Sequence, residues 1–158
     1  MTEKLLRPLR TCSWPERWLT RLLGAAVATA AYLLCLPWDL RNRIETPGSL
    51  SETTPVNGPD VVYLALVLIA LAAYFGHRDS PAWPLLVAAV PPAALMYLSF
   101  RTHPEPPDAE AWPLTWAFFT LVASAGVLVA ASVARRFQVD AVEAEAVEEG
   151  WVIRAQRS

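Results

Sequence analysis

Charged residues are missing from four long stretches of this chain. Asp, Glu and Lys do not occur in them, and Arg occurs only once, at Arg21 near the start of the first stretch. Charged residues make up 18% of the whole chain, whereas a soluble domain usually has about a quarter. The shortage argues against a water-soluble domain. The stretches are residues 18–37, 61–76, 82–100 and 112–134.

Cysteine is scarce as well. Cys12 and Cys35 lie toward the two ends of the first apolar stretch, so they should be on opposite sides of a membrane. A disulfide needs Cα atoms within about 7 Å of each other, which excludes a bridge between these two within one chain. No CxxC pair and no metal-ligand spacing occurs. The sequence therefore predicts neither a metal nor a cofactor.

The chain has no excess of basic residues. Its net charge is −2, and Lys4 is its single lysine. A protein that binds nucleic acid needs clustered Lys and Arg to contact the phosphates. We therefore expect no nucleic-acid partner. The preference for Arg over Lys, together with abundant Ala and Pro, is typical of a GC-rich bacterial genome.

The four apolar stretches suit a lipid bilayer. About twenty apolar residues cross its hydrocarbon core as a helix, and a charge buried there costs a few kcal/mol. The sequence predicts an all-α membrane protein, an antiparallel bundle of four transmembrane helices surrounded by membrane lipids. The first stretch could be a cleaved signal peptide, but its apolar residues continue past Ala30 to Leu36, so we expect it to be retained.

The distribution of basic residues predicts the orientation. Ten of the thirteen Lys and Arg residues fall at the N-terminal end, in the turn after the second stretch, or in the C-terminal tail. Cytoplasmic flanks carry such an excess, so both termini should be cytoplasmic, in the plasma membrane of a bacterium. Residues 1–17 should rest on the inner membrane surface, residues 18–134 should form the membrane domain, and residues 135–158 should be a cytoplasmic tail.

Small residues recur at four-residue spacing in two of the stretches. Gly126, Ala130 and Ala134 form one stripe, and Gly24 and Ala28 form a weaker one. Small side chains let helix backbones approach closely in a membrane. The stripes predict helix packing within the bundle or, alternatively, a face that docks onto a second copy or another membrane protein.

Two adjacent prolines interrupt the third stretch. Pro91 and Pro92 lack amide donors, and their rings push against the preceding turn, so the carbonyls near Val87 and Ala88 should lose their helical partners. We expect a kink here. Broken helices often line binding sites in transporters, so this position is a candidate hinge.

Acidic residues gather in the two segments expected outside the membrane. Asp39, Asp60, His103 and Glu105 could converge on a cation or act as an acid/base pair. No known ligand spacing matches them, and the surrounding prolines indicate a solvated acidic rim. They are weak outer-surface candidates.

The sequence points to no reaction. The first span lacks the embedded Glu on which small four-helix multidrug exporters depend, and no paired cysteines of the claudin-like kind occur. We expect a non-catalytic accessory or scaffold subunit that associates with itself or with another membrane protein. One alternative is a small transporter or lipid-binding protein that uses the Pro91-Pro92 break. Another is an enzyme with an outer acidic and histidine site.

Overall fold

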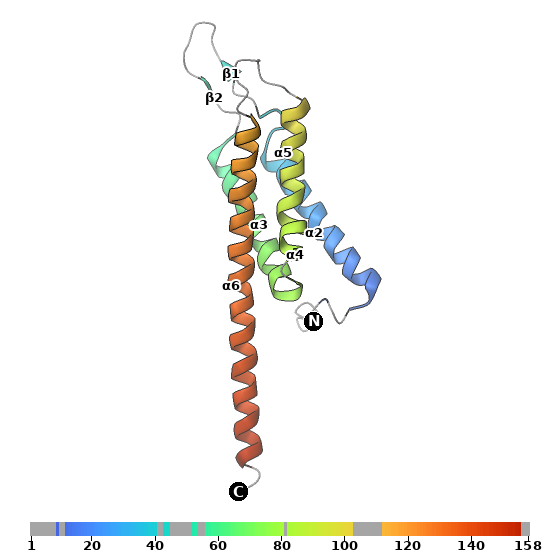
Figure 1. Cartoon of the computed structure of the whole chain (residues 1–158), viewed down its shortest axis with the longest axis vertical. Helices are drawn as coiled ribbons and strands as arrows, with labels where there is room; N and C mark the ends of the chain where they lie inside the picture. The colour runs from blue at the N-terminus through green and yellow to red at the C-terminus, as the bar shows by residue number, and fades with distance from the viewer. Residues whose placement is uncertain are drawn as a thin grey trace.

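The computed structural model is almost entirely helical over the residues it describes (Figure 1). Within them, four helices are long and apolar enough to cross a membrane, which confirms the prediction of four long apolar helices. The described residues are 9, 12–40, 43–44, 52–53, 56–80, 82–102 and 112–155, with residues 43–44, 52–53 and 138–155 described by their backbone alone. The four helices are Trp14–Cys35, Gly58–Arg78, Ala82–Thr102 and Trp112–Phe137.

Helices α2 (Trp14–Cys35) and α3 (Gly58–Arg78) both begin before the apolar stretches do. Each carries a proline in its first turn. A proline loses nothing there, because the first amide groups of a helix have no helical partner and the fixed φ of proline suits the helix. Both helices therefore start at prolines that would interrupt a helix if they lay in its interior.

The third span is a composite of α4 (Ala82–Pro84), η2 (Leu85–Ala89) and α5 (Val90–Thr102). Segment η2 is a π-helical turn, in which the Val90 amide donates to the Leu85 carbonyl five residues earlier. The wide turn lies immediately before Pro91 and Pro92, where the proline rings press on the preceding carbonyls. The predicted interruption thus takes the form of a π turn followed by a regular helix through both prolines.

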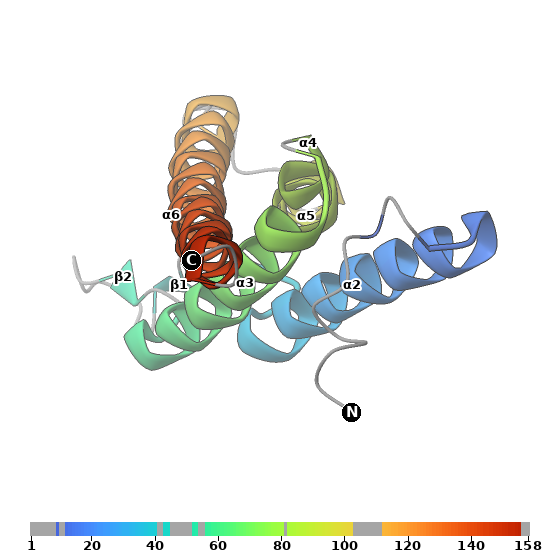
Figure 2. The ribbon, with the colours of Figure 1, turned by 90° about the horizontal axis from the view of Figure 1, so that it is seen from below.

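Helix α6 (Trp112–Ala155) is 44 residues long and continues well beyond the ends of the other helices (Figure 1). Seen along the bundle, α3 lies between α6 and α2, and it contacts both (Figure 2). The strands β1 (Arg43–Ile44) and β2 (Glu52–Thr53) pair antiparallel in the segment between α2 and α3, with Arg43 opposite Thr53. We call the end of the bundle beside these strands the loop end, and the end where residues 79–81 join α3 to α4 the turn end.

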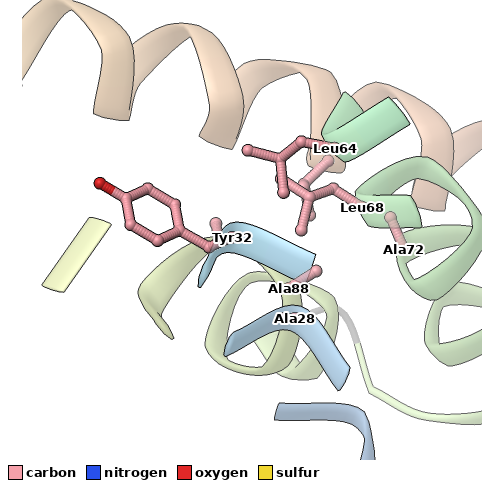
Figure 3. Close-up of a cluster of buried hydrophobic side chains, with 8 residues drawn as sticks. Ala28, Tyr32, Leu64, Leu68, Ala72 and Ala88 are labelled. Atoms are coloured by element: carbon pink, nitrogen blue, oxygen red, sulfur yellow. The ribbon is translucent and has the colours of Figure 1, made fainter. Parts of the chain in front are cut away.

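Small side chains bring the helices close together. Ala28 and Tyr32 of α2 pack with residues of α3, η2 and α6 in one buried cluster (Figure 3). A Cβ atom added to Gly76 would lie 2.7 Å from the Cα of Ala131, so α3 and α6 are in backbone contact there. The other members of the cluster are Leu64, Leu68, Ala72, Ala88, Ala89 and Val127.

Large apolar side chains cover the outside of the bundle. Leu34 is 86% exposed, and many other leucine, valine and phenylalanine side chains are more than half exposed. Soluble monomers rarely expose apolar patches of such extent. Hydrocarbon is the solvent that such a surface suits, in agreement with a multi-pass membrane protein.

Candidate functional site: an apolar cavity within the bundle

A cavity of about 760 Å³ opens between α2, α3, α5 and α6 in the half of the bundle nearest the loop end. Helices α3, α5 and α6 each contribute several residues to it, whereas α2 contributes Tyr32. On α5 and the preceding π turn, these residues are Ala89, Pro92, Ala93, Met96 and Phe100. Ligand sites in proteins commonly have volumes of about 300–1,000 Å³. The space is therefore large enough to hold a small organic molecule or part of a lipid.

The cavity exists because several of its lining residues are small. Ala65, Ala93, Ala123 and Gly126 face it from three helices. Among the residues that the structure describes, none comes within 4 Å of a Cβ atom added to Gly126. Larger side chains at these positions would fill the space that the helices leave between them.

The lining is hydrocarbon except for three hydroxyl groups, which belong to Tyr32, Thr115 and Thr120. None of the described residues that line the cavity carries a charge. The side chain of Tyr32 is buried, and its Oη atom has no hydrogen-bond partner within the described part of the chain. The same holds for Oγ1 of Thr120. A buried hydroxyl without a partner costs about 1–3 kcal/mol, so these two atoms are positions at which a ligand can gain a hydrogen bond.

The turn end holds a polar network of a different kind. Arg21 of α2 donates two hydrogen bonds to Asp79, from Nε to Oδ2 at 2.8 Å and from Nη2 to Oδ1 at 3.0 Å. The guanidinium of Arg21 also lies over Trp83, 3.5 Å from the ring centroid. Arg135 of α6 donates to the carbonyl oxygens of Gly76 at 3.0 Å and Asp79 at 2.9 Å.

This network, Arg21, Asp79, Trp83 and Arg135, is called the arginine clamp below. The Asp79 side chain is only 2% exposed and is paired, and both arginines bond to the segment that joins α3 to α4. A buried pair satisfied in this way holds helices in register. The clamp therefore fixes the geometry of the turn end, and it leaves the cavity as the candidate site for a ligand.

The structure separates the small-residue positions into two groups. Gly24 and Ala28 are buried in α2, and a Cβ on Gly24 would lie 2.7 Å from Cγ1 of Val87. On α6, Ala130 packs partly against the core and Ala134 is half-buried, whereas Gly126 opens into the cavity. The two stripes therefore do not form one continuous packing surface.

The remaining candidates fall at three places. Pro92 is buried and lines the cavity, and Pro91 beside it is half-buried. Asp39 follows the end of α2, and Asp60 lies in the first turn of α3, where it accepts a hydrogen bond from Asn57. His103 and Glu105 lie outside the described residues. Within the described residues, no group of three or more His, Cys, Asp or Glu side chains could hold a metal ion.

Aromatic residues of α5 and α6 pack on one another beside the cavity. Tyr97 lies edge-on to Trp112 and Trp116, with ring centroids 5.9 and 5.5 Å away. The indole Nε1 of Trp116 donates to the Ala93 carbonyl at 2.9 Å. These rings join the two helices, and the rings that face the cavity are those of Tyr32, Phe100 and Phe119.

The sequence analysis selected Pro92 as part of a candidate hinge and Gly126 as part of a packing face, and the structure places both in the lining of the cavity. The hydroxyls of Tyr32 and Thr120 were not predicted from the sequence. The only signal for them was their presence inside apolar stretches, where polar side chains are disfavoured. Comparisons with protein-family models, with curated proteins and with solved structures found no match to this chain.

Proposed function

We propose that this protein binds an apolar molecule of the membrane in the cavity between α2, α3, α5 and α6. The observation that carries the proposal is the cavity itself, about 760 Å³ of space lined by alkyl and aromatic side chains. Its wall includes Pro92 and Ala89, which flank the start of α5, and helix interruptions of this kind border binding sites in membrane transporters. A transporter or a lipid-binding protein would use such a site.

The proposed setting is the plasma membrane of a bacterium, with an antiparallel bundle and both termini in the cytoplasm. The distribution of basic residues supports this orientation, because most Lys and Arg residues lie in the segments that it assigns to the cytoplasm. The arginine clamp would then lie at the cytoplasmic end of the bundle. The cavity would lie in the outer half of the membrane.

A cavity-filling variant tests the binding function. Gly126→Phe is the variant of choice, because Gly126 lines the cavity and a Cβ atom added to it meets no described residue within 4 Å, so the ring can extend into the cavity. Val129→Phe is the matched control, since Val129 is exposed on the same helix and does not line the cavity. Native mass spectrometry of protein purified in mild detergent should find a bound lipid on the wild type and on Val129→Phe. It should find none on Gly126→Phe, and equal occupancy of all three would refute the proposal.

A second candidate function is that of an accessory or scaffold subunit. It is favoured by α6, whose helix continues for residues 138–155 past the end of the last membrane span (Figure 1). A helix of this length, about 27 Å at 1.5 Å per residue, is a suitable attachment point for a second copy or another membrane protein. Native mass spectrometry of the full chain and of a chain that ends at Phe137 tests it. A single subunit in both preparations would contradict a self-associating scaffold.

A further inference from the structure

We infer that the ligand of the cavity is an uncharged lipid with a hydroxyl or carbonyl oxygen, which hydrogen-bonds to Tyr32 and Thr120. This inference rests on the proposed binding function and specifies the chemical class of the ligand. It excludes fatty-acid anions, phospholipid headgroups and organic cations from the cavity. It also excludes molecules that consist only of hydrocarbon as the preferred ligand.

The charge of the lining sets the first restriction. None of the described lining residues is ionisable at neutral pH, since the polar groups among them are hydroxyls. A charged ligand group would leave water or the headgroup region without gaining an opposite charge, and such a transfer is strongly unfavourable. Neither arginine of the clamp lines the cavity: Arg21 is paired with Asp79, and Arg135 donates to the carbonyl oxygens of Gly76 and Asp79 at the turn end.

The two hydroxyls set the second restriction. Tyr32 is 2% exposed, and its Oη atom has no partner in the part of the chain that the structure describes. The Oγ1 atom of Thr120 is also buried and unpartnered, and both residues line the same cavity from different helices. Phe and Val at these positions would pack as well without a polar atom to satisfy.

The depth of the hydroxyls agrees with a weakly polar ligand. Tyr32 lies one turn before the end of α2, and Thr120 lies eight residues into α6, about 12 Å from its start. Both positions are below the helix ends, where a single hydroxyl or carbonyl can remain but a charged headgroup cannot. Further from the loop end, the cavity is lined by Leu68, Gly126 and Val127, which suit an alkyl chain.

Photolabelling with matched probes tests the inference. The purified full chain, in phosphatidylcholine nanodiscs, is labelled with diazirine derivatives of hexadecanol, hexadecane and palmitic acid. The alcohol should label cavity residues about tenfold more efficiently than the alkane, which corresponds to about 1.4 kcal/mol. Palmitate at pH 8 should label them no better than the alkane. Competition by dioleoylglycerol or by an isoprenoid quinone then distinguishes a hydroxyl-bearing lipid from a carbonyl-bearing one.

The variants Tyr32→Phe and Thr120→Val keep the shape of the cavity and remove its hydroxyls. Each should lower labelling by the alcohol and leave labelling by the alkane unchanged. Equal labelling by alcohol and alkane in the wild type, still blocked by Gly126→Phe, would overturn the inference and retain the binding function. Water as the only partner of the hydroxyls would give this same result. Labelling that Gly126→Phe does not change would overturn both.

Discussion

The contact between Gly76 and Ala131 leads to a prediction about two glycines that sequence alone treats alike. Gly76→Ala and Gly126→Ala both add one methyl group to a membrane-spanning helix. At Gly76 the new Cβ would lie 2.7 Å from the Cα and 2.9 Å from the carbonyl oxygen of Ala131. Those are backbone atoms, so α3 and α6 must move apart. At Gly126 none of the described residues lies within 4 Å of the new atom.

The two substitutions should change the free energy of unfolding in opposite directions. Replacing a helical glycine by alanine stabilises a helix by up to about 1 kcal/mol. Overpacking of a tight contact costs about 1–3 kcal/mol, and the upper end applies where backbone must move. Gly126→Ala should therefore be neutral or stabilise the fold by up to about 1 kcal/mol. Gly76→Ala should destabilise it by about 2 kcal/mol, which is the difference between the two terms.

Steric trapping in lipid bicelles measures these free energies of unfolding without removing the bilayer. Biotin tags near the two ends of the bundle report its opening as streptavidin binds. Gly24→Ala adds a third point, because the nearest atoms there belong to the Phe75 and Val87 side chains, which can adjust more than backbone can. Its loss should be smaller than that of Gly76→Ala. Equal shifts for Gly76→Ala and Gly126→Ala would refute the reasoning from close approach.

Three further predictions concern the clamp, the helix break and the orientation. Asp79→Asn leaves the guanidinium of Arg21 buried without an opposite charge and should destabilise the fold by about 3 kcal/mol in the same assay. The control is Asp60→Asn, at a half-buried position with one hydrogen bond, which should cost less than about 1 kcal/mol, as a surface substitution does. An equal loss of stability in both variants would contradict a special role of the clamp. Pro91→Ala combined with Pro92→Ala restores two amide donors, so the π turn should relax and the cavity wall should move. Photolabelling by hexadecanol should then fall while membrane insertion is unchanged. Unaltered labelling would show that the binding site does not depend on the helix break. Reporter fusions at both ends should give cytoplasmic signals, with alkaline phosphatase inactive and green fluorescent protein fluorescent, and opposite signals at the two ends would contradict an even number of crossings.

The sequence was sufficient for the spans because their signal is thermodynamic and local. A helix of about twenty residues without charge is what hydrocarbon permits, and each of the four stretches meets that condition on its own. Their boundaries were less predictable. Pro15 and Pro59 flank the apolar runs, yet each lies in the first turn of a helix. Whether a proline ends a helix or starts one depends on the turn in which it falls.

The candidate site was harder to predict because it depends on relations between helices. Gly126 and Gly76 look equivalent as small residues in apolar surroundings, but one opens into a cavity and the other touches a neighbouring backbone. Tyr32 and Thr120 are far apart in sequence and face the same space only after packing. The clamp is similar, since neither Arg21 nor Asp79 reveals its partner through local spacing.

The bonds from Arg135 have a consequence for the order of biogenesis. The carbonyl of Gly76 lies in the final turn of α3, where backbone acceptors have no partner from their own helix. Its partner in the finished fold is Arg135 of α6, a helix that leaves the ribosome after α3. Until that helix inserts, water or lipid headgroups must satisfy this acceptor. A nascent chain truncated before α6 would therefore expose an incomplete end to membrane quality-control proteases, and synthesis of α6 would remove that vulnerability.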